Sequence, residues 1–346
     1  MKSFENNRLD KLEISHDLLK SVRQLGEYRG RETLYRNQAP QVLKTLQQSA
    51  VIQSAESSNR IEGVVIPNPK RLKELIENRT QPENRSEQEI AGYRDVLNTI
   101  HGSYSDIPLT PNIVLQLHRD LFQFTTDQGG SWKQVDNTIT ETAPDGSKKI
   151  RFKPVAAWQT KEAMERLNGE YKEVMADPLI AVPAYILDFL CIHPFKDGNG
   201  RMARLLSLLL LYNAGYMVGR YISFERIVED SKDGYYDALY ASSQGWHDGK
   251  HDLRPWIEYF LGVMLMSAYR EFENRVGMVE TAKGAKAAMI IGAIEKLPVR
   301  FTIADVATRC PTVGIDHIRK TLRSERDAGN LRSEGRGPKA MWVKVL

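Results

Sequence analysis

A polar stretch of twelve residues interrupts the most apolar part of this chain. It runs from His193 to Arg204 as His-Pro-Phe-Lys-Asp-Gly-Asn-Gly-Arg-Met-Ala-Arg, between the apolar segments 180–192 and 205–212. Apolar segments bounded by such turn residues are typical of buried helices. The sequence therefore predicts two core helices joined by a tight turn, with the Gly-Asn-Gly turn opening the second helix.

The predicted start of the second helix has the features of a phosphate site. The first N–H groups of a helix have no partner within it and lie at the positive end of its dipole, so they bind anions. Gly198 and Gly200, on either side of Asn199, allow a ligand to approach the backbone closely. Arg201 and Arg204 are cations near the positive end of the helix dipole, which is an unfavourable position. This position is reasonable if both arginines bind phosphate.

The same stretch supplies a metal ligand and a base. The Asp197 carboxylate can hold a Mg²⁺ ion that takes its other ligands from water and phosphates. His193 has an ordinary pKa near neutrality, which suits a general base, and Phe195 is expected to anchor the turn in the core. Each feature alone is ordinary turn chemistry. Their combination indicates a nucleotide site with a base beside it.

This stretch resembles the Fic motif, His-x-Phe-x-(Asp/Glu)-Gly-Asn-Gly-Arg-x-x-Arg, and matches it at every defined position. The resemblance covers residues 87–268 and implies a mainly α fold, with a Fic helical core that carries a small β-hairpin flap. It also implies a protein adenylyltransferase. Such an enzyme moves AMP from ATP to a Tyr, Ser or Thr hydroxyl of a target protein or of itself.

The resemblance assigns a role to each part of the motif. His193 would deprotonate the target hydroxyl, which attacks the α-phosphorus as pyrophosphate departs. Asp197 would hold Mg²⁺ against the α- and β-phosphates, over the Gly-Asn-Gly turn. Arg201 and Arg204 would bind the charge of the β- and γ-phosphates.

A second short motif closes residues 1–63, which are predicted to be helical. The segment ends in Ser58-Asn-Arg-Ile-Glu62-Gly63, with Gly63 as the expected C-cap. Ser58 and Glu62 share a helix face, and a carboxylate at this negative helix end needs a compensating cation. The segment is similar to the inhibitory motif of Fic proteins, (Ser/Thr)-x-x-x-Glu-(Gly/Asn). That similarity implies that Glu62 pairs with Arg204, disturbs binding of the γ-phosphate and leaves the resting enzyme weakly active.

Residues 129–154 are the one region before the motif with β character. Two β-prone runs, Thr138-Ile139-Thr140 and Ile150-Arg-Phe152, flank the turn signal Pro144-Asp-Gly146. This pattern alone predicts a surface hairpin. In Fic proteins the corresponding flap binds the target segment by strand addition, so the resemblance implies that Thr138, Ile139 and Thr140 contact the target.

Three residues beyond the motif are candidates for the ATP site. Tyr235 and Tyr236 lie in a predicted helix, where paired tyrosines are usually packing residues. Their distance from the motif resembles that of the family's contacts to adenine and ribose. Ser243 stands where many relatives have an asparagine, and it is assigned to the same site.

Residues 281–346 are predicted to form a separate module. A helix over 287–297 precedes a helix start at Thr302 and Asp305, and a turn at Pro311 and Thr312 leads to a second helix. Two short extended pieces follow, joined by Gly335-Arg-Gly-Pro338. This order resembles a winged helix-turn-helix.

The charge of this module suggests contact with DNA. From residue 284 onward there are twelve Lys or Arg and six Asp or Glu, an excess of +6 against +4 for the whole chain. The cations of the second helix and the wing are Arg319, Lys320, Arg323, Arg326, Arg332, Arg336 and Lys339. They suit nucleic-acid phosphates. A winged helix used for protein contacts or dimer packing is the alternative.

Length and composition are consistent with a globular protein of several parts. We expect an N-terminal helical region over 1–85 that holds the inhibitory helix, a Fic catalytic core over 86–280 and a winged-helix-like domain over 281–346. No stretch suits a signal peptide or a membrane span. Cys191 and Cys310 form no metal or redox pattern, so we predict a cytoplasmic protein without a membrane partner.

Several functions stay open at this point. Some Fic relatives transfer phosphate or phosphocholine, or remove AMP from a modified target. Asp197 argues against the phosphotransferases, which carry lysine there, whereas AMP removal assisted by Glu62 remains an alternative. Another is a DNA-binding regulator with a Fic core as sensor, which an intact His193 disfavours. The expected partners are ATP, a protein with an exposed hydroxyl side chain, DNA through 281–346, and a second copy as a homodimer.

Overall fold

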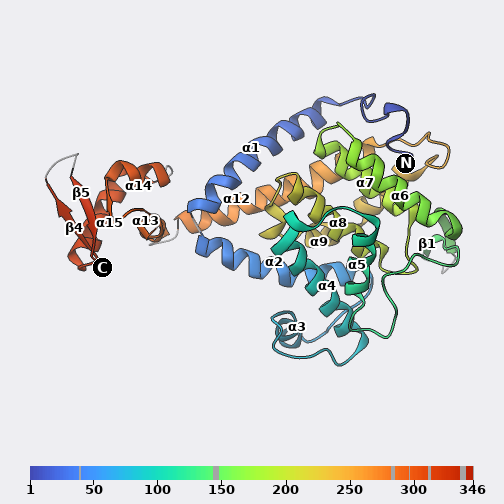
Figure 1. The fold of residues 1–346 in the computed structure, drawn as a ribbon, viewed down its shortest axis with the longest axis horizontal. Helices are drawn as coiled ribbons and strands as arrows, with labels where there is room; N and C mark the ends of the chain where they lie inside the picture. Colours follow the sequence, from blue (N-terminus) through green and yellow to red (C-terminus); the bar gives the residue numbers. More distant parts are fainter. Residues whose placement is uncertain are drawn as a thin grey trace. The chain divides into compact units, whose positions relative to one another are not determined.

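The computed structural model describes residues 1–38, 40–142, 148–281, 285–295, 297–310, 313–335 and 340–345. The chain divides into two compact units, one formed by residues 1–29 and 47–269 and the other by 30–46 and 270–346. The described residues are mainly helical (Figure 1), as predicted. None of the helices among them is both long and apolar enough to cross a bilayer.

Three long helices contribute residues to both units: α1 (His16–Gln38), α2 (Pro40–Ile61) and α12 (Met266–Thr281). The first unit adds α3 (Pro69–Ile76), α4 (Arg85–Ser103), α5 (Pro111–Leu121), α6 (Thr160–Glu173), α7 (Pro178–Ile192), α8 (Asn199–Asn213), α9 (Phe224–Asp230), α10 (Lys232–Ser243) and α11 (Arg254–Glu258). A π-helical turn, Tyr259–Leu265, links α11 to α12.

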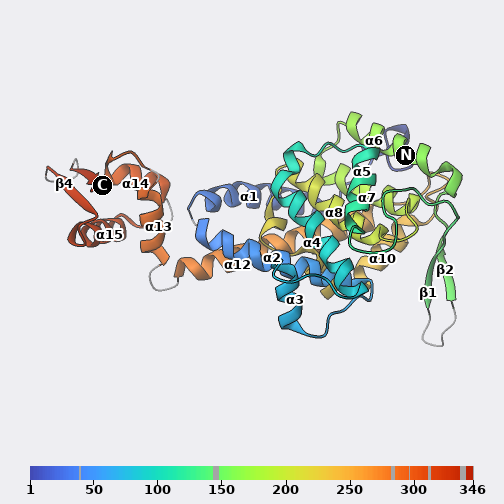
Figure 2. The same cartoon turned by 60° about the horizontal axis from the view of Figure 1, so that its bottom comes forward.

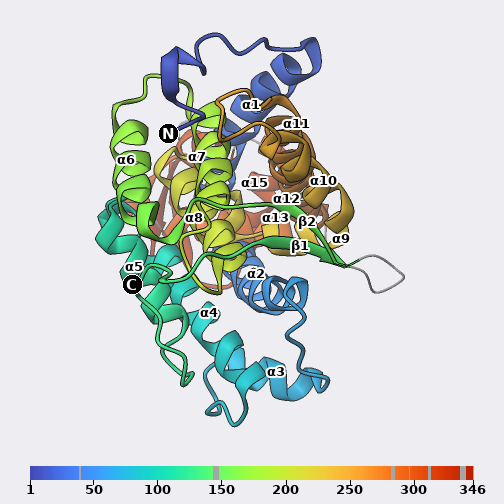
Figure 3. The same ribbon diagram turned by 90° about the vertical axis from the view of Figure 1, so that its right-hand side faces the viewer.

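Helices α7 and α8 form the centre of the first unit. Almost every side chain of both helices is buried, which is expected for helices that are apolar on all faces. They pack against each other, with α6 and α10 on either side of α7 (Figure 3). The two predicted core helices are confirmed, and α8 begins inside the Gly-Asn-Gly turn at Asn199.

A two-stranded antiparallel hairpin precedes these helices. Strand β1 (Ile139–Thr142) pairs with β2 (Lys148–Phe152), with a register shift between Ile139 and Thr140. Figure 2 shows the two strands projecting side by side from the helices. The predicted hairpin is confirmed, although β1 begins one residue after Thr138. The turn signal Pro144-Asp-Gly146 lies outside the described residues.

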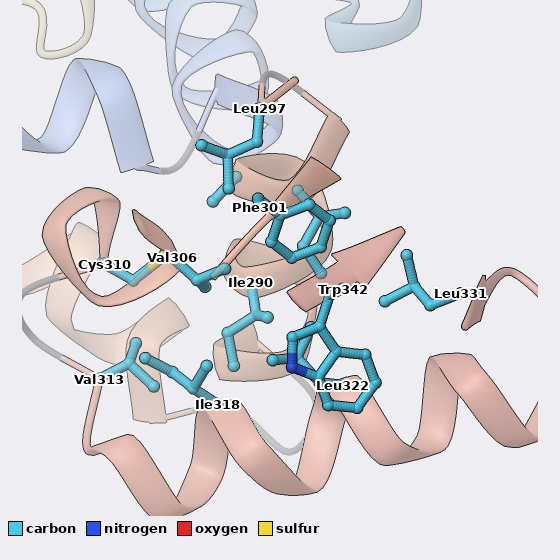
Figure 4. Packing of buried hydrophobic residues seen from close by; sticks show 12 residues of the cluster. Ile290, Leu297, Phe301, Val306, Cys310, Val313, Ile318, Leu322, Leu331 and Trp342 are labelled. Atoms are coloured by element: carbon cyan, nitrogen blue, oxygen red, sulfur yellow. The ribbon is translucent and has the colours of Figure 1, made fainter. Parts of the chain in front are cut away.

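The second unit contains three further helices and a small sheet. These are α13 (Ala285–Glu295), β3 (Arg300–Phe301), α14 (Ile303–Arg309), α15 (Ile315–Asp327), β4 (Leu331–Glu334) and β5 (Met341–Lys344). The antiparallel strand order is β3-β5-β4. Figure 4 shows the apolar core that α13, α14, α15 and the sheet share, including Phe301, Ile318 and Trp342.

Local signals in this unit are also confirmed. Thr302 and Asp305 form a capping box at the start of α14, each side chain accepting a bond from the other residue's N–H. The helices and the last two strands follow the predicted order, with α13 ending at Glu295, two residues before the predicted end, and β3 an additional strand that was not predicted. The assignment as a winged helix stays a prediction. The predicted turn at Pro311 and Thr312 and the cations Arg336 and Lys339 lie outside the described residues.

The packing of α4 on α5 generates a stability prediction. A Cβ atom at Gly92 of α4 would lie 2.0 Å from the backbone oxygen of Leu121, whereas one at Gly102 of the same helix would meet nothing within 4 Å. We expect Gly92→Ala to lower the free energy of unfolding by about 2 kcal/mol or more through overpacking. Gly102→Ala should leave it unchanged or raise it by up to ~1 kcal/mol. Urea unfolding of both variants tests the pair, and equal stabilities would contradict it.

Candidate active site

The motif begins where α7 ends. His193 is the C-cap of α7, in the left-handed conformation with φ of 51°, and its N–H donates to Phe189 O over 2.9 Å. Gly198, with φ of 80°, then turns the chain into α8. A β-carbon is unfavourable at this φ, and at Gly198 it would also lie 2.9 Å from a ring carbon of Phe122.

The turn between the helices is held from inside. Asn199 Oδ1 accepts the N–H of Phe195 over 2.9 Å, and Asn199 Nδ2 donates to Phe195 O over 2.8 Å. The Phe195 ring is fully buried and stacks on His118 with ring centres 3.6 Å apart. Phe195 therefore anchors the turn as expected, and the Asn199 side chain faces the turn.

His118 is a site residue that sequence reasoning missed. Gly130 N–H donates to His118 Nδ1 over 2.9 Å, so Nε2 carries the proton and donates to Asp197 O over 3.0 Å. Burial lowers the pKa of His118 to about 4, which keeps the ring neutral. One histidine in the amphipathic helix α5 carries no sequence signal for this role.

Lys133 and Asn137 also fasten the turn from an irregular segment. Lys133 N–H donates to Pro194 O over 2.9 Å, and its ammonium donates to Ile192 O over 3.0 Å. Asn137 Nδ2 donates to Phe195 O over 3.1 Å. Residues 193–198, here called the His193 loop, are thus held by hydrogen bonds from His118, from Asn199 and from the segment that carries Lys133 and Asn137.

A cavity of about 930 Å³ opens beside the motif, between the β1–β2 hairpin and α10. Its lining includes nine of the residues singled out in the sequence: Glu62, Ile139, Thr140, His193, Gly200, Arg204, Tyr235, Tyr236 and Ser243. Among the described residues, the lining does not include Ser58, Gly63, Thr138, Asp197, Gly198, Asn199 or Arg201. Arg151, Phe152, Lys232, Asp233, Asp237 and Tyr240 line it without having been predicted.

His193 is held as a neutral base at this cavity. Burial, with a smaller effect from the Lys133 charge, lowers the pKa of His193 to about 4. Its Nδ1 is buried and has no hydrogen-bond partner among the described residues. The imidazole is therefore unprotonated near neutral pH.

Arg204 brings the two predicted motifs together. Its Nε donates to Ser58 Oγ over 2.9 Å, and its Nη2 donates to Ser58 O over 3.0 Å and to Glu62 Oε1 over 2.7 Å. The arginine side chain is 5% exposed and that of Glu62 is 33% exposed. Burial alone would lower the pKa of Arg204, but its interactions with Glu62, Tyr235 and Tyr93 together outweigh burial and raise this pKa above its usual range.

The end of α2 sets the position of Glu62. Gly63 has φ of 84°, its N–H donates to Arg60 O, and Val64 N–H donates to Asn59 O. This is a Schellman C-cap, with Glu62 at the cap position. A Cβ atom on Gly200 would lie 2.5 Å from Glu62 Oε1, so the carboxylate lies directly over the first turn of α8.

Arg201 has different surroundings from those expected. Its guanidinium is 2% exposed, donates to Glu89 Oε2 over 2.6 Å and lies 5.2 Å from the centre of the Phe122 ring. Its charge is thus balanced inside the protein. Asp197, whose side chain is 60% exposed, lies 3.5 Å from Arg201 Nη2 and accepts Gly198 N–H over 2.6 Å.

Residues of α10 form the far wall of the cavity. Tyr235 is buried against Trp256 and Tyr259, and burial raises its pKa above the usual range. Tyr236 is half-buried, with the Lys232 ammonium 6.0 Å from its ring centre. Ser243 Oγ donates to Tyr240 O over 2.9 Å. This wall offers the aromatic side chains of Tyr235, Tyr236 and Tyr240 together with the charged side chains of Lys232, Asp233 and Asp237.

The chain is similar to known proteins. Residues 108–211 match the model of the Fic/DOC family. The chain is 24% identical over 265 residues to protein adenylyltransferase Fic of Drosophila melanogaster, an alignment that covers 75% of this chain and 47% of that protein. It is 30% identical over 115 residues to protein adenylyltransferase fic-1 of Caenorhabditis elegans, covering 32% of this chain and 20% of that protein. The chain spans about half the length, or less, of these curated relatives.

Solved structures have the same fold. A Fic family protein from Desulfovibrio desulfuricans superposes with a TM-score of 0.64 and 21% identity, over 96% of this chain and 97% of that one. A Fic domain containing signaling protein from Bacteroides thetaiotaomicron gives 0.57 and 21% identity, over 74% of this chain and 98% of that one. The motif, the match of residues 108–211 to the Fic/DOC family model and these likenesses together support a Fic domain with a Fic-like helical fold in this chain.

Proposed function

We propose that the chain is a protein adenylyltransferase that moves AMP from ATP to a hydroxyl side chain of a target protein or of itself, and that Glu62 inhibits it. The observation that carries this proposal is the position of the Glu62 carboxylate, which bonds Arg204 over the first turn of α8 in the cavity that holds His193. The names of the relatives, which are protein adenylyltransferases, support the same chemistry.

The cavity suits a nucleotide in size. Small-molecule sites commonly enclose 300–1,000 Å³, largely with apolar walls, and this one has about 930 Å³. In our proposal the phosphates lie at the N-terminus of α8, where Gly200 and Arg204 meet them. Tyr235, Tyr236 and Ser243 take the nucleoside. The Glu62 carboxylate competes with a phosphate because both are anions that bind Arg204.

His193 acts as the general base in this scheme. Its neutral ring takes the proton from the target hydroxyl, whose oxygen then bonds to the α-phosphorus as the bond to pyrophosphate breaks. The target segment would add to the flap near Ile139 and Thr140, which line the same cavity. The hydrogen bonds that hold the His193 loop would support catalysis, because a small displacement of a base lowers the reaction rate strongly.

Asp197 fits a magnesium ion shared with ATP. Its carboxylate is largely exposed, and it is one acidic ligand beside an anion site. Among the described residues there is no group of three or more potential metal ligands, which suits Mg²⁺, since this ion commonly keeps waters and phosphates as its other ligands. When bound, the ion would neutralise phosphate charge. Arg201, whose Nη2 lies 3.5 Å from the Asp197 carboxylate, would then orient that carboxylate.

Labelled ATP tests this function and its alternatives. We expect Glu62→Gly to raise protein labelling from α-labelled ATP about tenfold or more, because it removes the anion that competes at Arg204. His193→Ala in that background should lower labelling by at least about a hundredfold through loss of the base. Each protein is incubated alone and with a cell lysate, and labelling is read on a gel.

The other outcomes of that experiment point elsewhere. Labelling from γ-labelled ATP would indicate phosphotransfer. No labelling from either nucleotide would contradict adenylyl transfer and favour removal of AMP, or another donor. An unchanged rate in Glu62→Gly would contradict inhibition by Glu62 while leaving the transfer itself in place.

The lowered pKa of His193 predicts an unusual pH dependence. Because burial lowers this pKa to about 4, the base form persists at every pH above that value and is lost only as the pH falls through it. The negative charge of Glu62 raises the pKa of His193, so removing that charge should lower this pKa further. We expect the acid limb of AMP transfer by Glu62→Gly to lie at or below about pH 4. NMR titration of His193 checks the assignment, and a midpoint near the ordinary 6.5 would contradict it.

Contact with DNA through α15 is a second candidate function. The cations Arg319, Lys320, Arg323 and Arg326 are all exposed on its outer side, while Ile318, Thr321 and Leu322 are buried. Lys320 and Arg323 have no ion-pair partner among the described residues. Arg319 pairs with Asp316 and Arg326 with Asp327, and such exposed pairs are weak enough to exchange for phosphates.

The salt dependence of binding to a mixed-sequence DNA duplex tests this candidate. Lys320→Ala/Arg323→Ala in the full chain should weaken binding and reduce the slope of log K against log salt by about two, one for each lost phosphate contact. Lys20→Ala/Lys161→Ala removes the same charge from exposed sites of the first unit. Equal losses in both variants, or no salt-sensitive binding, would leave α15 with a protein-contact role.

A further inference from the structure

Besides the bonds from Arg204 to Ser58 and Glu62, contacts from α9 and α10 hold the end of α2. Arg60 Nη1 lies 3.0 Å from Glu229 Oε1 on α9. Lys232 Nζ, in the first turn of α10, donates to Ile61 O over 3.0 Å. Arg60 and Ile61 are the two residues immediately before Glu62, so both contacts act on the turn that carries this carboxylate.

Each contact compensates a specific local cost. The last carbonyls of a helix lack intrahelical partners and lie at its negative end, and the Lys232 ammonium satisfies one of them and balances the dipole. Glu229 is 18% exposed, so its pairing with Arg60 is less screened than that of a fully solvated pair. Burial alone would lower the pKa of Arg60, and its bonds to Glu229 and Glu56 raise it.

We propose that the Arg60–Glu229 pair and the Lys232–Ile61 bond form a latch that positions Glu62 over Gly200, so that opening the latch relieves the inhibition. This inference rests on the proposed function. Glu62 is one-third exposed and sits at the last position before the Gly63 turn, so its place depends on where the helix end is held. Arg60, Glu229 and Lys232 are then positioning residues.

The latch also links nucleotide entry to release of α2. Lys232 lines the same cavity as Arg204 and Glu62, and its ammonium can bond either Ile61 O or an anion in that cavity. A phosphate that draws Lys232 away removes one of the two contacts on the helix end. Nucleotide binding and Glu62 displacement therefore favour each other.

Hydrogen exchange of the full chain tests the latch without requiring activity. The amides of Gly63 and Val64 bond Arg60 O and Asn59 O at the end of α2. We expect Glu229→Gln and Lys232→Met each to speed exchange of these amides about three- to tenfold, the range for loss of one modest contact, with Lys232→Arg retaining slow exchange. Unchanged exchange in both variants would overturn the latch.

Matched controls separate the latch from general effects. Glu56→Gln removes the other partner of Arg60 on α2 itself, and Asp230→Asn breaks the Arg226 pair on α9. Neither touches a contact between α2 and α9 or α10, so both should exchange like the wild type. Equal acceleration in these controls would overturn the assignment to the latch.

Transfer of AMP supplies the second readout. Glu229→Gln should raise labelling from α-labelled ATP about three- to tenfold when Glu62 is present and should leave it unchanged in the Glu62→Gly background. A loss of labelling in both backgrounds would indicate a merely structural role and overturn the proposal. If Glu62→Gly itself labels nothing, the proposed function fails, and the exchange rates still decide whether the latch exists.

Discussion

The enclosed charge of Arg204 is the constraint on which the candidate site depends. A buried guanidinium needs an anionic partner, since removing one member of such a pair leaves an uncompensated charge. Here Ser58 and Glu62 supply its hydrogen bonds. Because Arg204 also lies in the first turns of α8, where the dipole disfavours a cation, an anion above that helix end is favoured twice. A carboxylate of α2 and a nucleotide phosphate meet the same requirement.

The two arginines of the motif have partners of different kinds. Arg201 is neutralised within the core by Glu89 and lies against Phe122, so its partner is fixed. Arg204 is paired with a partly exposed carboxylate at the end of a helix, so its partner can be exchanged. Under the proposed function, this difference would let one turn be rigid enough to orient His193 and still be open to inhibition by a neighbouring helix.

Much of the local structure could be predicted because its signals are local. The apolar runs on either side of the motif became α7 and α8, Gly63 became a C-cap, and Thr302 with Asp305 became a capping box. Each depends on residues within one or two turns. The β-prone run began at Thr138, one residue before β1, and a register shift follows Ile139, because β-propensity does not specify bulges.

The sequence by itself determined the motif, the helices that carry it and the candidate residues for phosphate binding, because spacing, glycine and charge act along the chain. Only the tertiary structure decided which acid neutralises which arginine, with Glu89 inside and Glu62 at the cavity. It also brought His118, Lys133 and the Arg60–Glu229 pair to the site. These contacts join residues far apart in sequence, and their energies come from burial and geometry that no periodic pattern records.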